Sequence, residues 1–400
     1  MRETLKVVPF TALAEINPNT QLPLQGECSF LGMSDVTDDG KFVSSHVRSV
    51  RESDGYTRFR DEDVLFAKIT PCMENGKGSR VDGLVSGYGF GSTEFHVLRA
   101  KGDSDSRFVG YWAQSRLLRQ RAEAFMVGSA GQRRVSASFF SRFKVPLLAV
   151  GEQRRIAETL DALDVVIDSA GQVIDKRSRV KQGVVDGLFS ERQDWLGRSL
   201  RSFLDHSPKN GFSPSEVGDW TGVRVLGLSC LTPDGFLPKQ LKNVPAWCSG
   251  VSSAVLEDGD LLISRANTRD LVGLAGRYRD VGGPCLYPDL MMRLRPSGRI
   301  LSEFLEISLR HSYMRRQIMA NAVGTSESMV KISSAIVQNL DICVPSLEEQ
   351  RRIVSIVDAH DERIAAERAR LEKLRKLKAG LMDDLLTGRV RVNQLQDLPV

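Results

Sequence analysis

The segment Glu152-Gln153-Arg154-Arg155-Ile156 recurs 197 residues later as Glu349-Gln350-Arg351-Arg352-Ile353. The correspondence continues without a gap, so that Asp161, Gly183 and Leu188 fall on Asp358, Gly380 and Leu385. Self-similarity at a fixed offset is the mark of a structural unit that occurs more than once. The 400-residue chain is therefore predicted to consist of two copies of one unit.

Both repeated segments have the apolar spacing of a long amphipathic helix. Apolar residues recur alternately four and three positions apart, which is typical of a coiled-coil seam. From the Glu-Gln pair to Leu188 or Leu385, each helix has 37 residues and a length of about 55 Å. We expect the two helices to pair antiparallel and to hold two globular domains apart. The predicted pairing residues are Ile156, Leu160, Leu163, Ile167 and Ile174 in the first copy and Ile353, Val357, Ile364, Leu371 and Leu374 in the second.

Polar residues interrupt both seams, and two interpretations of them remain open. Such residues fix the register of a coiled coil when they pair across it. Alternatively, their long side chains extend along the seam edge to solvent. The residues in question are Arg177, Lys181, His360, Glu367 and Lys378.

The residues before each helix match more weakly, as expected for two diverged domains on one backbone. Asp63 to Lys68, for example, corresponds to Asp260 to Arg265. The fold class is thus α+β, with two mixed α/β domains in tandem repeat, each followed by a long helix. Strands are predicted at Asp63 to Ile69, Glu94 to Leu98, Leu261 to Ile263 and Met291 to Leu294, and helical periodicity at Phe108 to Phe125 and Leu301 to Ala320. The predicted limits are 1–144 and 195–344 for the domains and 145–194 and 345–400 for the helical segments.

Composition excludes several classes of protein. Apolar residues make up 41% and charged residues 26% of the chain, no apolar run reaches the roughly 18 residues of a membrane span, and the N-terminus has no secretory signal. We therefore expect a cytoplasmic protein without a membrane. The six cysteines lack C-x-x-C spacing, which argues against zinc. Of the net charge of +5, each predicted domain carries +3, which permits nucleic-acid binding.

Motifs of DNA-modifying and nucleotide-binding enzymes are missing from the sequence. The glycine loop Gly87 to Gly91 lacks the strand-to-helix setting of a cofactor loop, and Asn17-Pro18-Asn19 lacks the second proline and the aromatic residue of an adenine methyltransferase tetrad. Gly76-Lys77 has no preceding glycine at phosphate-loop spacing. We expect no catalytic centre, no metal and no cofactor.

The residues that remain suit contacts with DNA. Arg and Asn read guanine and adenine through paired hydrogen bonds, whereas Lys, Ser and Thr more often hold phosphates. A solvated loop, or a loop that merely caps a helix and returns the chain, is the alternative at each place. The candidates are Lys68, Thr70, Asn75, Lys77 and Arg80 after one predicted strand, Arg265, Asn267 and Arg269 at the equivalent place, Gln132, Arg133 and Arg134 in Ser129 to Arg134, and Lys331 in the matching Thr325 to Lys331.

The order of a variable domain, Val-Pro, Glu-Gln-Arg-Arg-Ile and a long helix, repeated once, resembles Type I restriction-modification specificity subunits over essentially the whole chain. Ile69 to Lys77 and Gly89 to Phe95 resemble one subtype of their target-recognition domains, which adds Ser92 and Thr93 to the candidate DNA contacts. The second domain lacks these two motifs, so contacts carried over onto it are insecure.

The resemblance implies a non-catalytic subunit with a division of labour. Each recognition domain would read one half of a bipartite double-stranded DNA target, and the helices would set the gap. Two methylation subunits would dock around the helices, and two restriction motor-nuclease subunits would complete the complex. The alternatives are a pseudo-dimeric DNA-binding regulator that acts alone and an interaction scaffold without a DNA role.

Overall fold

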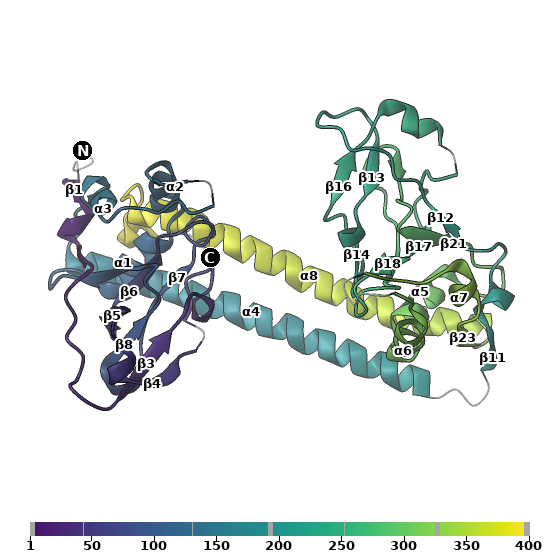
Figure 1. Cartoon of the computed structure of the whole chain (residues 1–400), viewed down its shortest axis with the longest axis horizontal. Helices are drawn as coiled ribbons and strands as arrows, with labels where there is room; N and C mark the ends of the chain where they lie inside the picture. The colour runs from purple at the N-terminus through teal and green to yellow at the C-terminus, as the bar shows by residue number, and fades with distance from the viewer. Residues whose placement is uncertain are drawn as a thin grey trace. The chain divides into compact units, whose positions relative to one another are not determined.

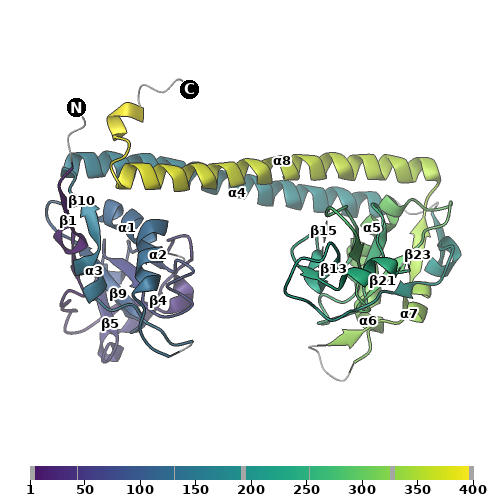
Figure 2. The ribbon, with the colours of Figure 1, turned by 90° about the horizontal axis from the view of Figure 1, so that it is seen from above.

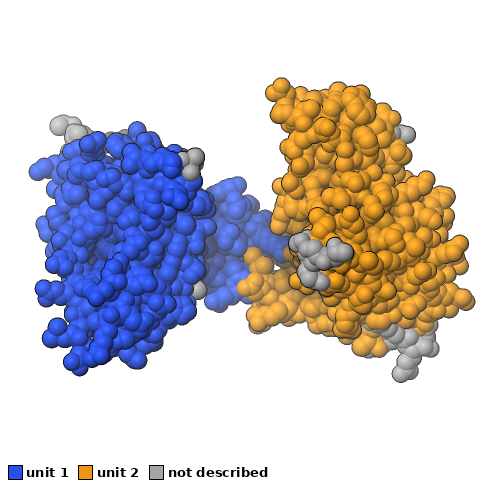
Figure 3. Space-filling view, viewed as in Figure 1, with its two compact units in different colours: residues 1–173, 367–400 blue, residues 174–366 orange. Residues whose placement is uncertain are grey.

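The computed structural model describes residues 5–42, 44–129, 131–190, 195–251, 253–324 and 329–395. The chain divides into two compact units (Figure 3). Unit 1 comprises residues 1–173 and 367–400, and unit 2 comprises residues 174–366. Each long helix therefore contributes one half to each unit.

Unit 1 is built on two four-stranded sheets (Figure 1). The first has the order β2 (Ala14–Ile16), β9 (Phe95–Ala100), β6 (Val64–Ala67) and β7 (Gly78–Arg80), with every neighbouring pair antiparallel. The second has the order β4 (His46–Ser49), β3 (Glu27–Leu31), β8 (Tyr88–Gly91) and β5 (Thr57–Arg60), in which β3 and β8 are parallel. A separate antiparallel pair joins β1 (Val7–Pro9) to β10 (Lys144–Pro146).

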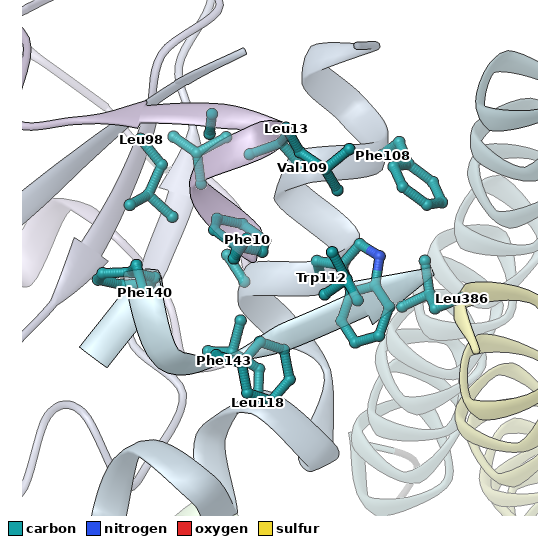
Figure 4. Close-up of a cluster of buried hydrophobic side chains, with 14 of the residues drawn as sticks. Phe10, Leu13, Leu98, Phe108, Val109, Trp112, Leu118, Phe140, Phe143 and Leu386 are labelled. Atoms are coloured by element: carbon teal, nitrogen blue, oxygen red, sulfur yellow. The ribbon is translucent and has the colours of Figure 1, made fainter. Parts of the chain in front are cut away.

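Three helices cover the first sheet of unit 1 and build its core with an end of the long helices. They are α1 (Ser106–Gln114), α2 (Arg116–Ala124) and α3 (Ser138–Arg142). The Asp105 side chain caps α1 by accepting hydrogen bonds from two backbone N–H groups, and Phe108 and Trp112 then bury one face of that helix. Leu386 of the second long helix lies in the same cluster as Trp112 (Figure 4). The helix end is thus part of the domain core.

Unit 2 repeats the order of the first sheet in full and that of the second sheet with three strands in place of four. Its larger sheet has the order β12 (Lys209–Asn210), β21 (Met291–Leu294), β17 (Leu261–Ser264) and β19 (Ala275–Arg277). Its second sheet has the order β16 (Leu241–Asn243), β13 (Arg224–Leu226) and β20 (Cys285–Leu286), again with a parallel pair at β13 and β20. The remaining pairs are β11 (Leu196–Ser199) with β23 (Asp341–Val344), β14 (Leu231–Thr232) with β15 (Gly235–Phe236) and β18 (Ala266–Asn267) with β22 (Val330–Lys331).

The helices of unit 2 match those of unit 1 in order: α5 (Ser302–Arg310), α6 (Ser312–Asn321) and α7 (Ser334–Gln338). The predicted fold class, two mixed α/β domains in tandem repeat, is confirmed, and each of the four predicted strands overlaps an observed strand. The predicted helical stretches are each divided into two helices, at Ser115 and His311. Both residues have extended backbone, and each side chain accepts a hydrogen bond from an N–H of the second helix, which starts that helix anew.

The long helices are α4 (Val150–Ser190, 41 residues) and α8 (Leu347–Leu386, 40 residues). All ten predicted pairing residues are buried or half-buried, as a seam would require, and their direct pairing stays a prediction. In each unit the two helices lie side by side and run antiparallel (Figure 2). Ile156, Leu160, Ile353 and Val357 also belong to the domain cores, a role that the seam pattern did not predict.

Two of the polar seam residues form ion pairs between the helices rather than extending to solvent. In unit 1, Lys378 donates to Asp164 at 2.6 Å, and the lysine side chain is only 19% exposed. In unit 2, Lys181 pairs with Asp361 in the same way. Lys378 and Asp361 lie 197 residues after Lys181 and Asp164, so the two pairs are copies of each other. This reciprocity supports the interpretation that these lysines fix the register.

A buried glutamine joins each domain to its long helix. Gln153 is fully buried, and its amide oxygen accepts a hydrogen bond from the Asp105 N–H at 3.1 Å. Its amide nitrogen donates to the carbonyls of Leu148 (2.8 Å) and Asp103 (3.4 Å). One side chain therefore fixes the N-terminus of α1 against the start of α4.

The second copy makes the same connection. Gln350, also fully buried, accepts from the Leu301 N–H at 2.8 Å and donates to the carbonyls of Pro345 and Arg299. Leu301 precedes α5 as Asp105 precedes α1. The repeated Glu-Gln motif is thus explained by packing, because its glutamine satisfies three backbone groups in each copy.

We predict that Gln153→Leu lowers the free energy of unfolding of unit 1 by about 3 kcal/mol, because it leaves three buried backbone groups without partners. Urea unfolding measures the effect. Gln172→Ala, at an exposed position of the same helix, is the matched control and should change stability by less than about 0.5 kcal/mol. Equal stabilities of the two variants would show that the glutamine does not hold the domain to the helix.

Candidate nucleic-acid interface

Three segments of unit 1 that were predicted separately as DNA contacts lie together. Residues 68–71, 92–94 and 131–135 form what we name the first loop cluster. The Lys68 N–H donates to the Glu94 carbonyl at 2.9 Å, the Val135 N–H donates to the Lys68 carbonyl at 2.9 Å, and the Thr70 N–H donates to the Arg133 carbonyl at 3.0 Å. The backbone therefore holds the three segments of the cluster together.

The arginines of the first loop cluster are oriented by carboxylates. Arg134 binds Glu94 through two guanidinium nitrogens at 2.9 and 3.0 Å, and this contact lowers the pKa of the Glu94 carboxyl. Arg133 reaches Glu74 at 3.4 Å, and Glu74 also accepts from the Thr70 hydroxyl at 2.8 Å. Both arginine side chains are about 40% exposed, at 40% and 42%. The partner carboxylates Glu94 and Glu74 are less exposed, at 26% and 18%, so these pairs hold the two guanidinium groups in place at the edge of the cluster.

A buried, neutral histidine hydrogen-bonds the backbone of the first loop cluster. His96 is 5% exposed, and its Nε2 donates to the Val135 carbonyl at 2.9 Å. Its Nδ1 faces the Asn17 amide at 3.0 Å. Burial lowers the pKa of His96, and the nearby Lys68 lowers it further. The imidazole therefore stays uncharged beneath the loop at neutral pH.

Sequence reasoning missed a buried arginine that shapes the adjoining loop. Arg119, 6% exposed, donates to the carbonyls of Ala113, Met73, Gly76 and Lys77 at 2.7 to 3.2 Å. Burial lowers the pKa of Arg119 to about 9. A single arginine within a helix resembles any solvated charge, so only its tertiary contacts reveal this role.

Unit 2 has a counterpart to this buried arginine. Arg315 donates to the carbonyls of Val272 at 2.6 Å and Asp270 at 2.8 Å, and burial lowers its pKa. Arg315 lies on α6, which corresponds to α2, the helix that bears Arg119. In unit 1, therefore, an arginine on α2 holds the loop that follows β6. In unit 2, an arginine on α6 holds the loop that follows β17.

The other predicted contact residues of unit 1 differ in their exposure, their partners and their position. Asn75, Thr93 and Gln132 are exposed, and the Ser92 hydroxyl accepts from the Glu94 N–H. Lys77 donates to the Met33 carbonyl at 3.0 Å. Arg80 lies outside the first loop cluster, since it binds Ser106 at 2.9 Å and pairs with Glu62 and Asp82.

Unit 2 presents a second loop cluster, residues 265–269, 290 and 330–332, at the corresponding place. The Arg265 N–H donates to the Leu290 carbonyl at 2.8 Å, as Lys68 does to Glu94, and the Ile332 N–H donates to the Arg265 carbonyl at 2.9 Å. Strands β18 and β22 pair within it. The backbone connections are therefore the same as in the first loop cluster.

The side chains of the second loop cluster differ from those of the first. Lys331 is exposed, and Asn267 accepts from the Thr268 N–H at 2.9 Å. Arg269 instead donates to the carbonyls of Met319 and Ala322 at the end of α6, which is a helix-capping contact. The predicted segment Thr325 to Ser328 lies outside the described residues.

The described part of the chain holds no group of three or more His, Cys, Asp or Glu side chains arranged to bind a metal ion. Among these same residues, no helix is long and apolar enough to cross a membrane.

Comparison with known proteins identifies the family of the chain. A family model described as "Type I restriction modification DNA specificity domain" matches residues 14–176 and 251–376. The chain is 38% identical over 190 residues to the Escherichia coli Type I restriction enzyme EcoAI specificity subunit and 33% identical over 193 residues to the EcoEI specificity subunit of the same species. These matches cover 46% and 47% of this chain but only 32% of each relative.

The fold also matches a solved structure. A chain from work on complex assembly and conformational transition of the type I R-M system superposes with a TM-score of 0.61, covering 98% of this chain and 99% of that one. At 18% identity, this likeness shows a shared fold.

We predict that unit 1 loses stability as the pH falls from 7 to 5, because the pKa of His96 lies below its ordinary value of 6.5. Below pH 6.5 His96 takes up a proton in the unfolded chain but not in the folded one. The free energy of unfolding therefore falls by up to about 1.4 kcal/mol per pH unit until the pH reaches the pKa of His96 in the folded chain. Above pH 6.5 this contribution to stability is complete.

Urea unfolding at pH 7 and pH 5 measures this dependence. His96→Gln, which keeps a donor for the Val135 carbonyl, should flatten it, whereas His206→Gln, at an exposed histidine, should leave it intact. An equally steep dependence in His96→Gln and the unaltered chain would contradict the assignment of the proton to His96.

Proposed function

This chain belongs to the Type I restriction modification DNA specificity domain family, and on that premise we propose that it is the DNA-reading specificity subunit of a Type I restriction-modification complex. One observation carries the proposal. The sheets and the backbone connections of the loops recur in both units, but the side chains of the loops differ. Both units have a four-stranded sheet of the same order, a second sheet with a parallel pair, and the same backbone connections in their loop clusters. Recognition of two different half-sites requires this combination of constant support and variable side chains.

Each unit is proposed to read one half of a bipartite double-stranded target. In unit 1, Arg133, Arg134 and Lys68 supply cations, and Thr70, Asn75, Ser92, Thr93 and Gln132 supply neutral hydrogen-bonding groups. In unit 2, Arg265, Asn267 and Lys331 are the corresponding set. Lys77 and Arg269 contribute by holding their loops, because both donate to backbone carbonyls. Arg80 is the weakest of the predicted contacts, since it lies outside the first loop cluster and its side chain is only 23% exposed.

The reactions are proposed to belong to partner subunits. Two methylation subunits would dock around α4 and α8, and two restriction subunits would complete the complex in the cytoplasm. Residues 1–144 and 195–344 would act as interchangeable readers, and residues 145–194 and 345–400 as the spacer. Support for the spacer comes from the two continuous helices of 41 and 40 residues and from the copied lysine–aspartate pairs.

Exchange of one reader tests the division of recognition. Replacing residues 195–344 with the corresponding domain of another family member should change one half of the methylated target and preserve the other half. Sequencing of methylated sites in cells that carry the chimera gives the result. Replacing residues 1–144 is the reciprocal control and should change the opposite half. If either exchange altered both halves, the two-reader model would be wrong.

Lengthening the helices tests the spacer. A heptad inserted after Gly171 in α4, with a second heptad inserted after Arg370 in α8, lengthens both helices by about 10.5 Å. At 3.4 Å per base pair, the gap between the half-sites should widen by about three base pairs while both half-sites stay the same. A methylated target with its original gap would show that another part of the complex sets the spacing.

A further inference from the structure

A hollow of about 430 Å³ adjoins the first loop cluster and shares Lys68 with it. Phe95 and Val97, both almost completely buried, give it an apolar lining. Asn19, from the segment after β2, and Arg58 of β5 add an amide and a second cation. The hollow thus combines apolar surface with hydrogen-bond donors and positive charge.

Among the described residues, those that line this hollow carry an excess of positive charge. No aspartate or glutamate lines it among the described residues, and no carboxylate of this part of the chain lies within ion-pair distance of Lys68. Glu94, whose backbone carbonyl accepts from the Lys68 N–H, is engaged through its carboxylate by two guanidinium nitrogens of Arg134. Asp54 pairs with Arg58 at 3.3 Å, but its side chain is 96% exposed, so this pair is weak.

A neighbouring hollow of the same volume provides the contrast. It contains Arg60, two residues along β5 from Arg58, but three consecutive carboxylates, Asp61 to Asp63, also line it. Its arginines therefore face compensating acids, and Asp63 binds Arg99 at 2.7 Å. Of these two hollows, only the one at Lys68 has the charge that attracts an anion.

Tyr56 gives the Lys68 hollow a rigid aromatic wall. Its ring centroid lies 5.4 Å from that of Phe30 and 5.5 Å from that of Phe90, yet the side chain remains 40% exposed. A ring held in this way can cover a ligand at little entropic cost, because its conformation is already fixed.

We propose that this hollow binds one sugar–phosphate unit of a DNA strand, with the phosphate between Lys68 and Arg58 and the deoxyribose against Tyr56 and the apolar lining. The inference rests on the proposed DNA-reading function and adds Arg58, Tyr56 and Asn19 to the contact residues of unit 1. A phosphate contact positions a protein on DNA without reading its sequence. The hollow therefore anchors unit 1 while the neighbouring loop cluster reads bases.

Binding of the full chain, in the complex that it forms, to target and non-target duplexes over a range of salt concentrations tests the proposal. Arg58→Ala and Lys68→Ala should each weaken both duplexes by about tenfold and reduce the slope of log affinity against log salt by about 1. Arg60→Ala removes the same charge from the same strand and should leave affinity within twofold of the unaltered chain. Thermal unfolding checks that each variant is folded.

The outcomes separate this inference from the proposed function. If the unaltered complex does not discriminate target from non-target DNA, the proposed function fails and the inference fails with it. If it does discriminate, but Arg58→Ala keeps the original affinity and salt slope, only the inference is overturned. Tight binding of a free deoxynucleoside monophosphate, combined with DNA affinity that is insensitive to Arg58→Ala, would assign the hollow to a small molecule and also overturn it.

Discussion

The buried glutamine at the start of each long helix is the contact on which the arrangement depends. Gln153 and Gln350 are each completely buried and connect to backbone groups on both sides of a domain–helix junction. An unpaired backbone group in such a place costs about as much as a lost hydrogen bond, so few side chains of other shape fit there. This explains why the glutamine is the same in both copies while the loops that face solvent have diverged. The constraint lies at the junction, and the variation lies in the loops that face solvent.

Ion pairs between the two long helices set the register of these helices relative to each other. An apolar seam by itself allows helices to slide by a heptad, whereas a buried charge without its partner is costly. Asp164 accepts from Lys378 and also from the Tyr111 hydroxyl of α1, at 3.0 Å. The helix pair and the first domain therefore share one carboxylate. Glu152 adds a contact of the same kind with Arg391 at 2.5 Å. Position along the helices and attachment of the domain are thus coupled in unit 1.

The sequence predicted those features that repeat or have a regular period. The duplication and the two long helices followed from spacing, and the tandem mixed α/β class followed from the duplication. The divisions at Ser115 and His311 were missed, because neither residue breaks helical periodicity and the capping bond appears only in three dimensions. Arg119 and Arg315 were missed because the sequence does not distinguish a buried arginine from a solvated one. The gathering of residues 68–71, 92–94 and 131–135 into one cluster depends on long-range pairing that no local pattern contains.

We propose that recognition lies in the two loop clusters on one repeated frame and that catalysis belongs to partner subunits. The most direct test is to sequence the methylated bases of a host genome with and without the gene for this chain. The account predicts that deletion abolishes methylation at a single motif made of two defined half-sites separated by a gap of unspecified bases. Unchanged methylation, or the loss of a motif without a gap, would contradict it.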